Sequence, residues 1–294
     1  MIVGIDIGGT NFRIGGLDSN NEVINFKKLN VNDVLKSNDV LYDIKNMIND
    51  NFSKEDIEAI SIGFPGTISK DKKVVVQVPN VKGMNNLNAV DYLHNAFNVP
   101  VYIDRDVNML IEYDLFNSKI KNENIIIAVY YGTGIGNTIL INGEPISGKD
   151  GTAGELGHIP VDDCDYVCGC GNIGCMEAVA GGKYLAKLCE EKFKNTHISD
   201  VFVKHHDDVD VIKFVDRMSM ALTSEINILN PDTIIVGGGI VNMKDFPFDL
   251  FMDCIKKHTR KPYPLNSLNI VFVKDDEQKG VIGACLYAKN KMAV

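Results

Sequence analysis

Three of the seven cysteines in the chain stand close together in the stretch VCGCGNIGCMEA at residues 167–178. Thiolates at such spacing are typical ligands of a tetrahedral zinc ion, which takes four protein ligands in structural sites. Cys168, Cys170 and Cys175 would supply three of them, and either His158 or Cys164, both upstream, could supply the fourth. A zinc held by four protein ligands has no open position, so we expect a structural and not a catalytic metal.

Two glycine-rich turns each stand between two β-rich runs, in DIGGTN at 6–11 and in YGTGIGN at 131–137. Glycines let backbone N–H groups approach an anion closely, and threonine adds a hydroxyl donor, so such turns can hold phosphates. For either turn taken alone, an ordinary β-hairpin is the favoured interpretation. A dinucleotide-binding fingerprint is excluded, because it needs a helix after the glycines and NTILIN is strand-like.

A carboxylate that could accept a proton follows a strand-like run in VYIDRDVN at 101–108. Asp106 would begin the next helix, where the helix N-terminus favours the ionised form that a base needs. The ordinary alternative is a helix N-cap, a role that aspartate often fills and that is compatible with the first. Asp104 is the second carboxylate at this place and the alternative base.

Strands and helices alternate along the chain, which predicts α/β layers with mixed sheets. Strand-like runs occupy 57–66, 99–104 and 233–241, and helical patterns occupy 37–50, 86–97 and 107–116. A further helix is predicted by apolar residues that recur every three or four positions, namely Val215, Met218, Leu222, Ile226 and Leu229. We expect an N-terminal domain over 1–116, to which 279–294 returns, and a C-terminal domain with the zinc loop over 117–278.

The composition excludes several classes of protein. A length of 294 residues with 45% hydrophobic and 23% charged residues is typical of a globular chain of two domains. The net charge of -9 argues against nucleic acid or an anionic membrane as a partner. Met1–Val3 leads directly into a strand-like run without a signal peptide, and the odd number of cysteines favours a reducing compartment. We therefore expect a cytoplasmic protein.

The motifs DIGGT, GTGIG, GELGH at 154–158 and CGCGNIGCME at 168–177 follow one another as in the ROK family of sugar kinases and repressors, part of the actin-like ATPase superfamily. The resemblance covers essentially the whole chain. Within that family, the stretches GFPGTISKDKK, PVYIDRDVN, AGELGHIPV, INILNPDTIIVGGG and MKDFP most resemble the D-allose kinases.

The resemblance implies two actin-like, ribonuclease H-like domains with an interdomain cleft and a zinc-bound loop. The implied reaction is ATP-dependent phosphorylation of D-allose at its 6-hydroxyl, with Mg²⁺ as a cofactor and a structural Zn²⁺. The alternatives within the family are a glucokinase and an N-acetylmannosamine or N-acetylglucosamine kinase. A homodimer is implied as well.

The resemblance also assigns roles to individual residues of this chain. Asp106 is the implied catalytic base. The sugar-binding residues are Gly66, Asn80, Arg105, Asp106, Glu155, His158 and Glu177. The nucleotide-binding residues are Asp6, Gly8, Gly9, Thr10, Asn11, Gly132, Thr133, Gly134, Gly136, Gly238 and Gly239. The zinc ligands are His158, Cys168, Cys170 and Cys175.

One position departs from the glucose-directed members, which typically have asparagine immediately before the catalytic aspartate. Here that residue is Arg105, as in the allose kinases, so we expect it to contribute to a preference for allose. Asn11 stands where many members have lysine. A sugar-sensing repressor is the alternative outside enzymes, and we disfavour it because the chain starts at the first phosphate strand and is acidic.

Overall fold

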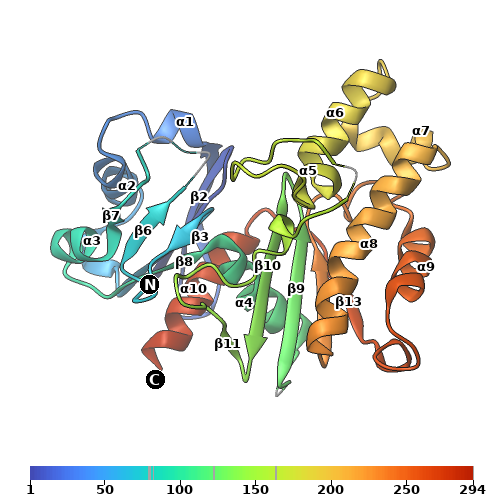
Figure 1. The fold of residues 1–294 in the computed structure, drawn as a ribbon. Helices are drawn as coiled ribbons and strands as arrows, with labels where there is room; N and C mark the ends of the chain where they lie inside the picture. Colours follow the sequence, from blue (N-terminus) through green and yellow to red (C-terminus); the bar gives the residue numbers. More distant parts are fainter. Residues whose placement is uncertain (79–80, 82, 122, 163, 294) are drawn as a thin grey trace. The chain divides into compact units, whose positions relative to one another are not determined.

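The computed structural model describes residues 1–293 apart from 79, 80, 82, 122 and 163. It divides into two compact units (Figure 1): the first contains residues 1–121, 147–153 and 276–294, and the second contains 122–146 and 154–275. Residues 147–153 thus pack within the first unit, although they lie in the range expected for the second domain. The predicted cleft between the domains stays a prediction.

A five-stranded mixed sheet in the order β3-β2-β1-β4-β8 forms the centre of the first unit. β1 is antiparallel to β2 and parallel to β4, and β4 is parallel to β8. All residues of β1 and β4 are buried, because both faces of the sheet are covered. The strands are β1 (Ile2–Ile7), β2 (Asn11–Leu17), β3 (Val23–Asn30), β4 (Ala59–Phe64) and β8 (Val101–Arg105).

Helices cover this sheet, and α10 with α4 forms one of the layers. The opposite face carries a larger apolar core that includes Ile44, Ile62 and Leu93. A small antiparallel sheet, β5-β6-β7, completes the unit. Its strands are β5 (Thr67–Ile68), β6 (Val74–Gln77) and β7 (Leu87–Asn88), and the helices are α1 (Val31–Val34), α2 (Val40–Asn49), η1 (Lys54–Asp56), α3 (Ala89–Phe97), α4 (Asp106–Ser118) and α10 (Lys279–Met292).

The second unit repeats the same pattern of strand directions in a sheet of order β11-β10-β9-β12-β13. Its strands are β9 (Ile125–Tyr131), β10 (Ile135–Ile141), β11 (Glu144–Pro145), β12 (Thr233–Gly237) and β13 (Ile270–Phe272). Its helices are η2 (Leu156–His158), α5 (Glu177–Ala180), α6 (Gly182–Lys192), η3 (Ile198–Asp200), α7 (Val201–His205), α8 (Val209–Leu229), α9 (Phe248–His258) and η4 (Leu265–Ser267).

The predicted α/β class with mixed sheets is confirmed in both units. The long helix predicted from its apolar spacing is α8, whose residues Val215, Met218, Leu222 and Ile226 are fully buried. The strand predicted over 233–241 is shorter than expected: β12 ends at Gly237, because Gly238 has a φ of +95° that extended backbone does not allow. Within the described residues, no helix is both long and apolar enough to cross a membrane.

Candidate functional site

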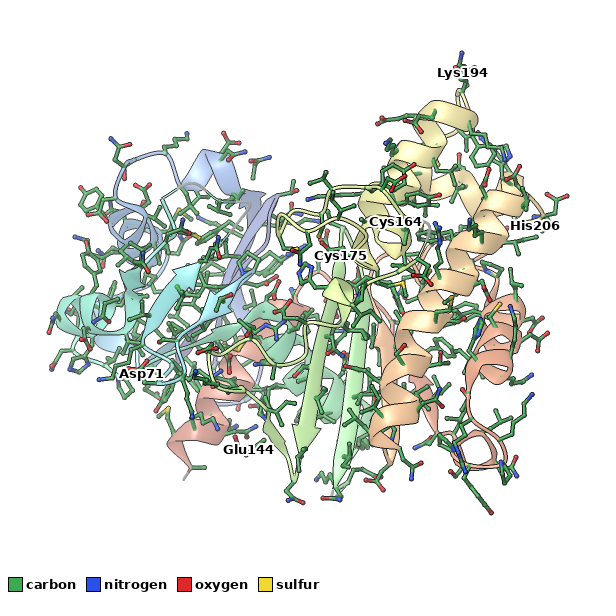
Figure 2. All side chains as sticks on the ribbon, viewed as in Figure 1. Asp71, Glu144, Cys164, Cys175, Lys194 and His206 are labelled. Carbon is green, nitrogen blue, oxygen red and sulfur yellow. The ribbon has the colours of Figure 1, made fainter. Side chains whose placement is uncertain are left out.

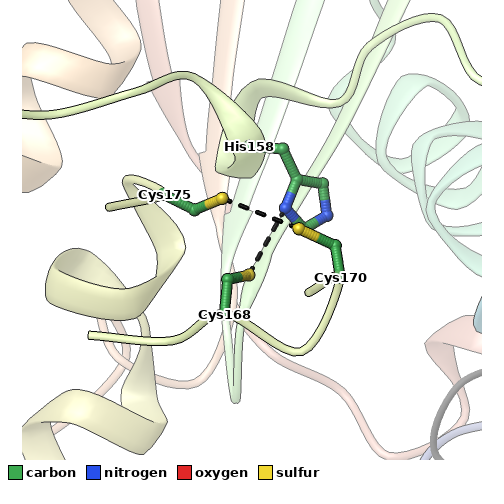
Figure 3. Close-up of side chains that lie close together, drawn as sticks. All are labelled: His158, Cys168, Cys170 and Cys175. Carbon is green, nitrogen blue, oxygen red and sulfur yellow. Dashed lines mark hydrogen bonds between the residues drawn. The ribbon is translucent and has the colours of Figure 1, made fainter. Parts of the chain in front are cut away.

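The four predicted zinc ligands lie together in the second unit (Figure 3). One ligand atom from each of His158, Cys168, Cys170 and Cys175 falls within 4.8 Å of all the others. Cys168 and Cys170 lie in a short loop that Gly171 turns with a φ of +95° and that an antiparallel bridge between Val167 and Ile173 closes, and Cys175 follows this loop by two residues. The loop therefore gathers its thiols locally, and His158 reaches them from the end of η2.

Two of the distances between donor atoms in this cluster match the edges of a tetrahedral zinc site. Cys168 Sγ lies 3.6 Å from His158 Nδ1, and Cys170 Sγ lies 3.7 Å from Cys175 Sγ. Zinc bonds of about 2.3 Å to sulfur and about 2.05 Å to nitrogen imply edges of about 3.8 Å and about 3.6 Å in a regular tetrahedron. Cys164 was the competing ligand, but its side chain belongs to the apolar core of the unit. Figure 2 labels Cys164 and Cys175 among all the side chains.

The pKa values of the thiols indicate whether the cluster suits a bound cation. Burial, and then the neighbouring thiols, raise the pKa of Cys175 to about 12. Burial likewise raises the pKa of Cys168, whereas a hydrogen bond from the Asn172 backbone lowers the pKa of Cys170. A divalent cation supplies the positive charge that lets three neighbouring thiols ionise together, so this donor set suits a metal.

His158 also faces the carboxylate of Glu155, the other residue of GELGH predicted to bind sugar. Its Nδ1 points to the thiols, and its Nε2 lies 3.5 Å from Glu155 Oε2. A carboxylate beside the second ring nitrogen is the usual way in which a metal-bound histidine is held in one orientation. Glu155 is exposed and His158 is half-buried, so both remain accessible to solvent.

Glu177 stands two residues after Cys175, in the first turn of α5, and contacts the second glycine turn. Its Oε2 accepts a hydrogen bond of 2.9 Å from the backbone N–H of Ile135. A Cβ at Gly134 would lie only 2.1 Å from the same oxygen, so a larger residue there would displace the Glu177 carboxylate. The cysteine loop at 167–175 and the predicted phosphate turn are thus joined through one carboxylate within the second unit.

Backbone N–H groups at the start of α6 bind carbonyl groups of the same glycine turn, which was not predicted from the sequence. Gly182 N–H donates to Gly132 O at 2.9 Å, and Lys183 N–H donates to Thr133 O at 3.0 Å. A Cβ at Gly182 would lie 2.5 Å from Gly132 O. The paired glycines Gly181 and Gly182 that follow α5 were the available signal. Thr133 is exposed on the turn.

The first glycine turn, in the first unit, places Asp6 at the end of β1 and Gly9 and Thr10 at the surface. Asp6 is buried, and its Oδ2 accepts a hydrogen bond of 2.8 Å from Arg13 Nη1. The hairpin register sets Arg13 directly opposite Asp6, so the strand pairing could have predicted this ion pair. A Cβ at Gly280, in α10, would lie 2.4 Å from Asp6 Cγ.

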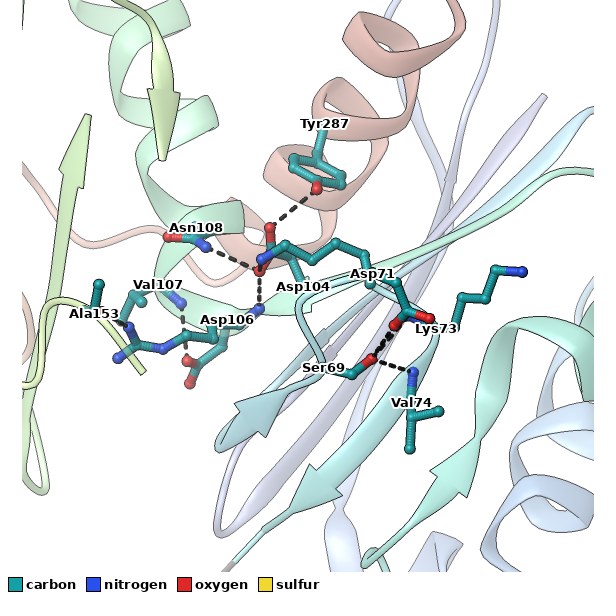
Figure 4. Close-up of polar contacts among 12 residues, drawn as sticks. Ser69, Asp71, Lys73, Val74, Asp104, Asp106, Val107, Asn108, Ala153 and Tyr287 are labelled. Carbon is teal, nitrogen blue, oxygen red and sulfur yellow. Dashed lines mark hydrogen bonds and ion pairs between the residues drawn. The ribbon is translucent and has the colours of Figure 1, made fainter. Parts of the chain in front are cut away.

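Asp106 begins α4 as predicted, with Arg105 and not Asp106 in the N-cap position. Its Oδ1 accepts a hydrogen bond of 2.8 Å from the Val107 backbone N–H (Figure 4). Asp104, the alternative base, is only 1% exposed, and both of its carboxylate oxygens accept hydrogen bonds. Asp106 is half-buried and remains the better placed of the two to meet a substrate.

The side chain of Arg105 donates from Nη1 to the carbonyl of Ala153 at 2.8 Å. Ala153 closes the segment 147–153, which also packs on β5 through Gly151. Arg105 therefore holds this segment within the first unit.

The other predicted binding residues are dispersed through both units. Gly66 packs on β6, where a Cβ would lie 2.1 Å from Gln77 O. Asn80 lies outside the described residues. In the second unit, Gly238 packs on the end of β9, Gly239 is exposed and Gly136 belongs to β10. In the first unit, Asn11 is the first residue of β2 and follows the turn that contains Gly8. The roles given to the individual residues remain predictions.

Comparison with known proteins identifies the family to which the chain is similar. The ROK family profile matches residues 2–291. The chain is 27% identical to the glucokinase of Thermotoga maritima over 99% of this chain and 98% of that protein. It is 32% identical to the xylose repressor of Bacillus spizizenii, over 62% of this chain and 48% of the repressor.

A solved structure has the same fold. The Streptomyces griseus ROK family glucokinase, crystallised with glucose and AMPPNP, matches with a TM-score of 0.79 at 21% identity, over 98% of this chain and 99% of that one. The motifs, the two mixed sheets and the profile that spans nearly the whole sequence agree with one another. The chain belongs to the ROK family.

Proposed function

We propose that this protein is an ATP-dependent sugar kinase that phosphorylates the 6-hydroxyl of an aldohexose, with D-allose as its preferred substrate. The observation that carries the proposal is the pair of glycine turns, each with a threonine at the surface, together with the half-buried Asp106 at the start of α4. The similarity to a glucokinase along nearly the whole chain supports the same reaction class.

In the proposed reaction, Asp106 takes the proton of the sugar 6-hydroxyl while that oxygen bonds to the γ-phosphorus of ATP. The bond between the γ-phosphorus and the bridging oxygen breaks, and ADP leaves. Phosphoryl transfer depends mostly on positioning and charge stabilisation, which the N–H groups of the glycine turns supply. Asp6, held by Arg13, would meet the Mg²⁺ of MgATP, and that ion would neutralise phosphate charge.

We propose a structural role for zinc in the Cys3His cluster. With all four positions taken by His158 and the three cysteines, the ion would hold η2 and the start of α5 together. Glu155 and Glu177, predicted sugar ligands, lie three residues before His158 and two after Cys175. Fixing the ligands of zinc would therefore fix the backbone of both glutamates.

The choice of D-allose rests on the resemblance in sequence and on Arg105. Allose and glucose differ only in the orientation of the 3-hydroxyl. Arginine has no acceptor and a rigid set of donors, so it cannot reproduce the contacts of the asparagine found in glucose-directed relatives. The contact of Nη1 with Ala153 adds an indirect route, in which Arg105 shapes the sugar pocket by holding residues 147–153.

Glucose is the second candidate substrate, because of the long match to the Thermotoga maritima glucokinase. N-acetylmannosamine and N-acetylglucosamine follow. A regulator without kinase activity is the candidate outside enzymes, supported by the partial match to a xylose repressor.

The test is ADP release measured with ATP, Mg²⁺ and a panel of aldohexoses, N-acetylhexosamines and fructose. We expect the highest kcat/KM for allose, and a shift of the allose-to-glucose ratio toward glucose in Arg105→Asn. A preference for glucose or an N-acetylhexosamine would refute the allose assignment but not the kinase. An unchanged ratio in Arg105→Asn would remove only the role of Arg105. Sugar binding without turnover on any member of the panel would favour the regulator.

A further inference from the structure

Lys72, which is not among the predicted site residues, forms an ion pair with the buried carboxylate of Asp104. It lies at the tip of the hairpin between β5 and β6, in the stretch SKDKK at 69–73. Its Nζ lies 2.7 Å from Oδ1 of Asp104, 32 residues further along the chain. Both residues belong to the first unit.

Asp104 is deeply buried and heavily bonded (Figure 4). Besides Lys72, its Oδ1 accepts from the Arg105 backbone N–H at 2.8 Å and from Asn108 Nδ2 at 2.9 Å. Its Oδ2 accepts from the hydroxyl of Tyr287 at 3.0 Å. A charge at 1% exposure needs an opposite charge as well as neutral donors, and the ammonium group of Lys72 provides it.

The contacts of Asp104 bracket the predicted catalytic base. One partner, the Arg105 N–H, directly precedes Asp106, and another, Asn108, follows it by two residues in the first turn of α4. The carboxylate therefore connects the end of β8 to the start of α4 across Asp106. A change in the position of Asp104 would move the backbone from which the Asp106 side chain extends.

The hairpin turn is built so that Lys72 reaches this carboxylate. Its backbone N–H donates to Ser69 O at 2.8 Å, and Ser69 Oγ accepts from the N–H of Val74 at 2.9 Å. Lys72 has a φ of +56°, a left-handed conformation that costs free energy for a residue with a side chain. Most other non-glycine residues with positive φ in the described chain are asparagines, such as Asn86 and Asn98, which tolerate it better. Strained backbone of this kind is often retained for function.

We propose that Lys72 is a positioning residue for Asp106, and that it acts by neutralising Asp104 and fixing the turn between β8 and α4. This inference rests on the proposed kinase function, since it assigns Asp106 the role of base. Lys72 itself touches no reacting atom in this account.

Lys72→Met is the test, because it keeps the length of the side chain and removes the charge. We expect kcat to fall about 10–100-fold with the KM values for ATP and sugar little changed, since small displacements of a catalytic group have effects of this size. Lys72→Arg, which restores a cation, should return kcat to within about threefold of the wild type. The control is Lys73→Met, in which the neighbouring exposed lysine, directed away from Asp104 in Figure 4, is changed with no effect on kcat.

Amide hydrogen exchange over residues 102–108 provides a readout that needs no substrate. In Lys72→Met the Arg105 amide should exchange about tenfold faster, because its acceptor is less firmly held. A wild type that phosphorylates no sugar would refute the proposed function, and exchange alone would then decide whether Lys72 holds the turn. If kcat and exchange are both unchanged in folded Lys72→Met, the proposal is wrong. If that variant does not fold, Lys72→Gln, which keeps a donor without the charge, replaces it with the same expected results.

Discussion

At the scale of single residues, two carboxylates two positions apart have different surroundings. Asp104 is 1% exposed and accepts hydrogen bonds at both oxygens, whereas Asp106 is half-buried at the first position of α4. A buried and saturated carboxylate stabilises structure, and one that a substrate can reach can exchange a proton. Environment therefore separates the roles of two chemically identical groups.

Asp106→Asn should abolish most of the sugar phosphorylation and leave the protein folded. The amide oxygen can still accept the hydrogen bond from Val107 N–H, so we expect the free energy of unfolding to change by less than about 1 kcal/mol. Loss of a positioned base should lower kcat about 10²–10⁴-fold. Steady-state kinetics and denaturation test both statements. The matched control is Asp91→Asn, which changes an exposed acid in the first turn of α3. Near-normal turnover in Asp106→Asn would mean that Asp106 has only a structural role.

Glu225, on α8, should make the stability of the protein depend on pH. Burial raises the pKa of Glu225 from 4.5 to about 7, and the hydrogen bond from Asn137 Nδ2 at 2.8 Å only partly opposes this. Because the folded pKa is the higher one, the folded state binds the extra proton between these values. The contribution of Glu225 to stability is therefore greatest below pH 4.5, falls as the pH rises to about 7, and is constant above it.

The variant Glu225→Gln removes the ionisation while keeping the shape and an acceptor for Asn137. At pH 8 we expect it to raise the free energy of unfolding by up to about 3 kcal/mol, and at pH 4.5 by close to nothing. Urea denaturation at the two pH values measures this. Glu190→Gln, on the exposed side of α6, matches the change in charge and should lack the pH-dependent gain. An equal effect of Glu225→Gln at both pH values would contradict the prediction.

At the scale of elements, α10 and the start of α6 each stabilise a chemically important turn. α10 packs through Gly280 against Asp6, forms a buried ion pair of 2.7 Å between Lys279 and Asp114 of α4, and reaches Asp104 with Tyr287. In the second unit, Gly182 and Lys183 hold the carbonyls of the glycine turn. The glycine turns thus depend on helices distant in sequence as well as on their own glycines.

Gly132→Ala and Gly182→Ala should separate nucleotide binding from the packing of the turn. A Cβ at Gly132 meets no described atom within 4 Å, so we expect that variant to keep its stability but to bind nucleotide more weakly, since the methyl group would keep phosphates from the backbone. A Cβ at Gly182 would collide with Gly132 O, and we expect a loss of about 1–3 kcal/mol in stability. Calorimetric titration with a non-hydrolysable ATP analogue and thermal unfolding measure the two effects. Unchanged nucleotide affinity in Gly132→Ala would refute the role of this turn.

At the scale of the whole molecule, the two units repeat one sheet pattern and divide the predicted site residues between them. Gly66, Arg105 and Asp106 belong to the first unit, and His158 and Glu177 belong to the second. The chain passes between the units several times, and Arg105 bonds Ala153 where it leaves the first unit for the second.

Zinc removal should destabilise the second unit. We expect about one zinc ion per purified chain, because four ligands are gathered there. Chelation should lower the melting temperature of that unit by about 5 °C or more, since 1 kcal/mol corresponds to about 2–4 °C at this size. Elemental analysis measures the zinc content, and calorimetry with and without chelator measures the melting temperature. Cys168→Ser should lose the metal and Cys164→Ser should keep it; a stable, fully active protein with little zinc would end the hypothesis.

The sequence alone predicted the features that depend on near neighbours along the chain. The glycine turns, the thiols of Cys168, Cys170 and Cys175, and the helix start at Asp106 are local, and their geometry follows from backbone freedom and short spacing. The alternation of strands and helices also predicted mixed sheets from local information, because the hydrophobic periodicity of each segment indicates its own secondary structure.

Only the tertiary structure decided which distant residues meet. The spacing of the residues left the fourth ligand open between His158 and Cys164, and only the family resemblance favoured His158. The sequence gave no sign that Lys72 and Tyr287, 32 and 183 residues from Asp104, would share that carboxylate. Nothing in a local pattern identifies such partners, because they come together only when sheets and helices pack. A buried charge is stable only beside hydrogen-bond donors or an opposite charge, and the packing of the folded core determines which side chains lie close enough to provide them.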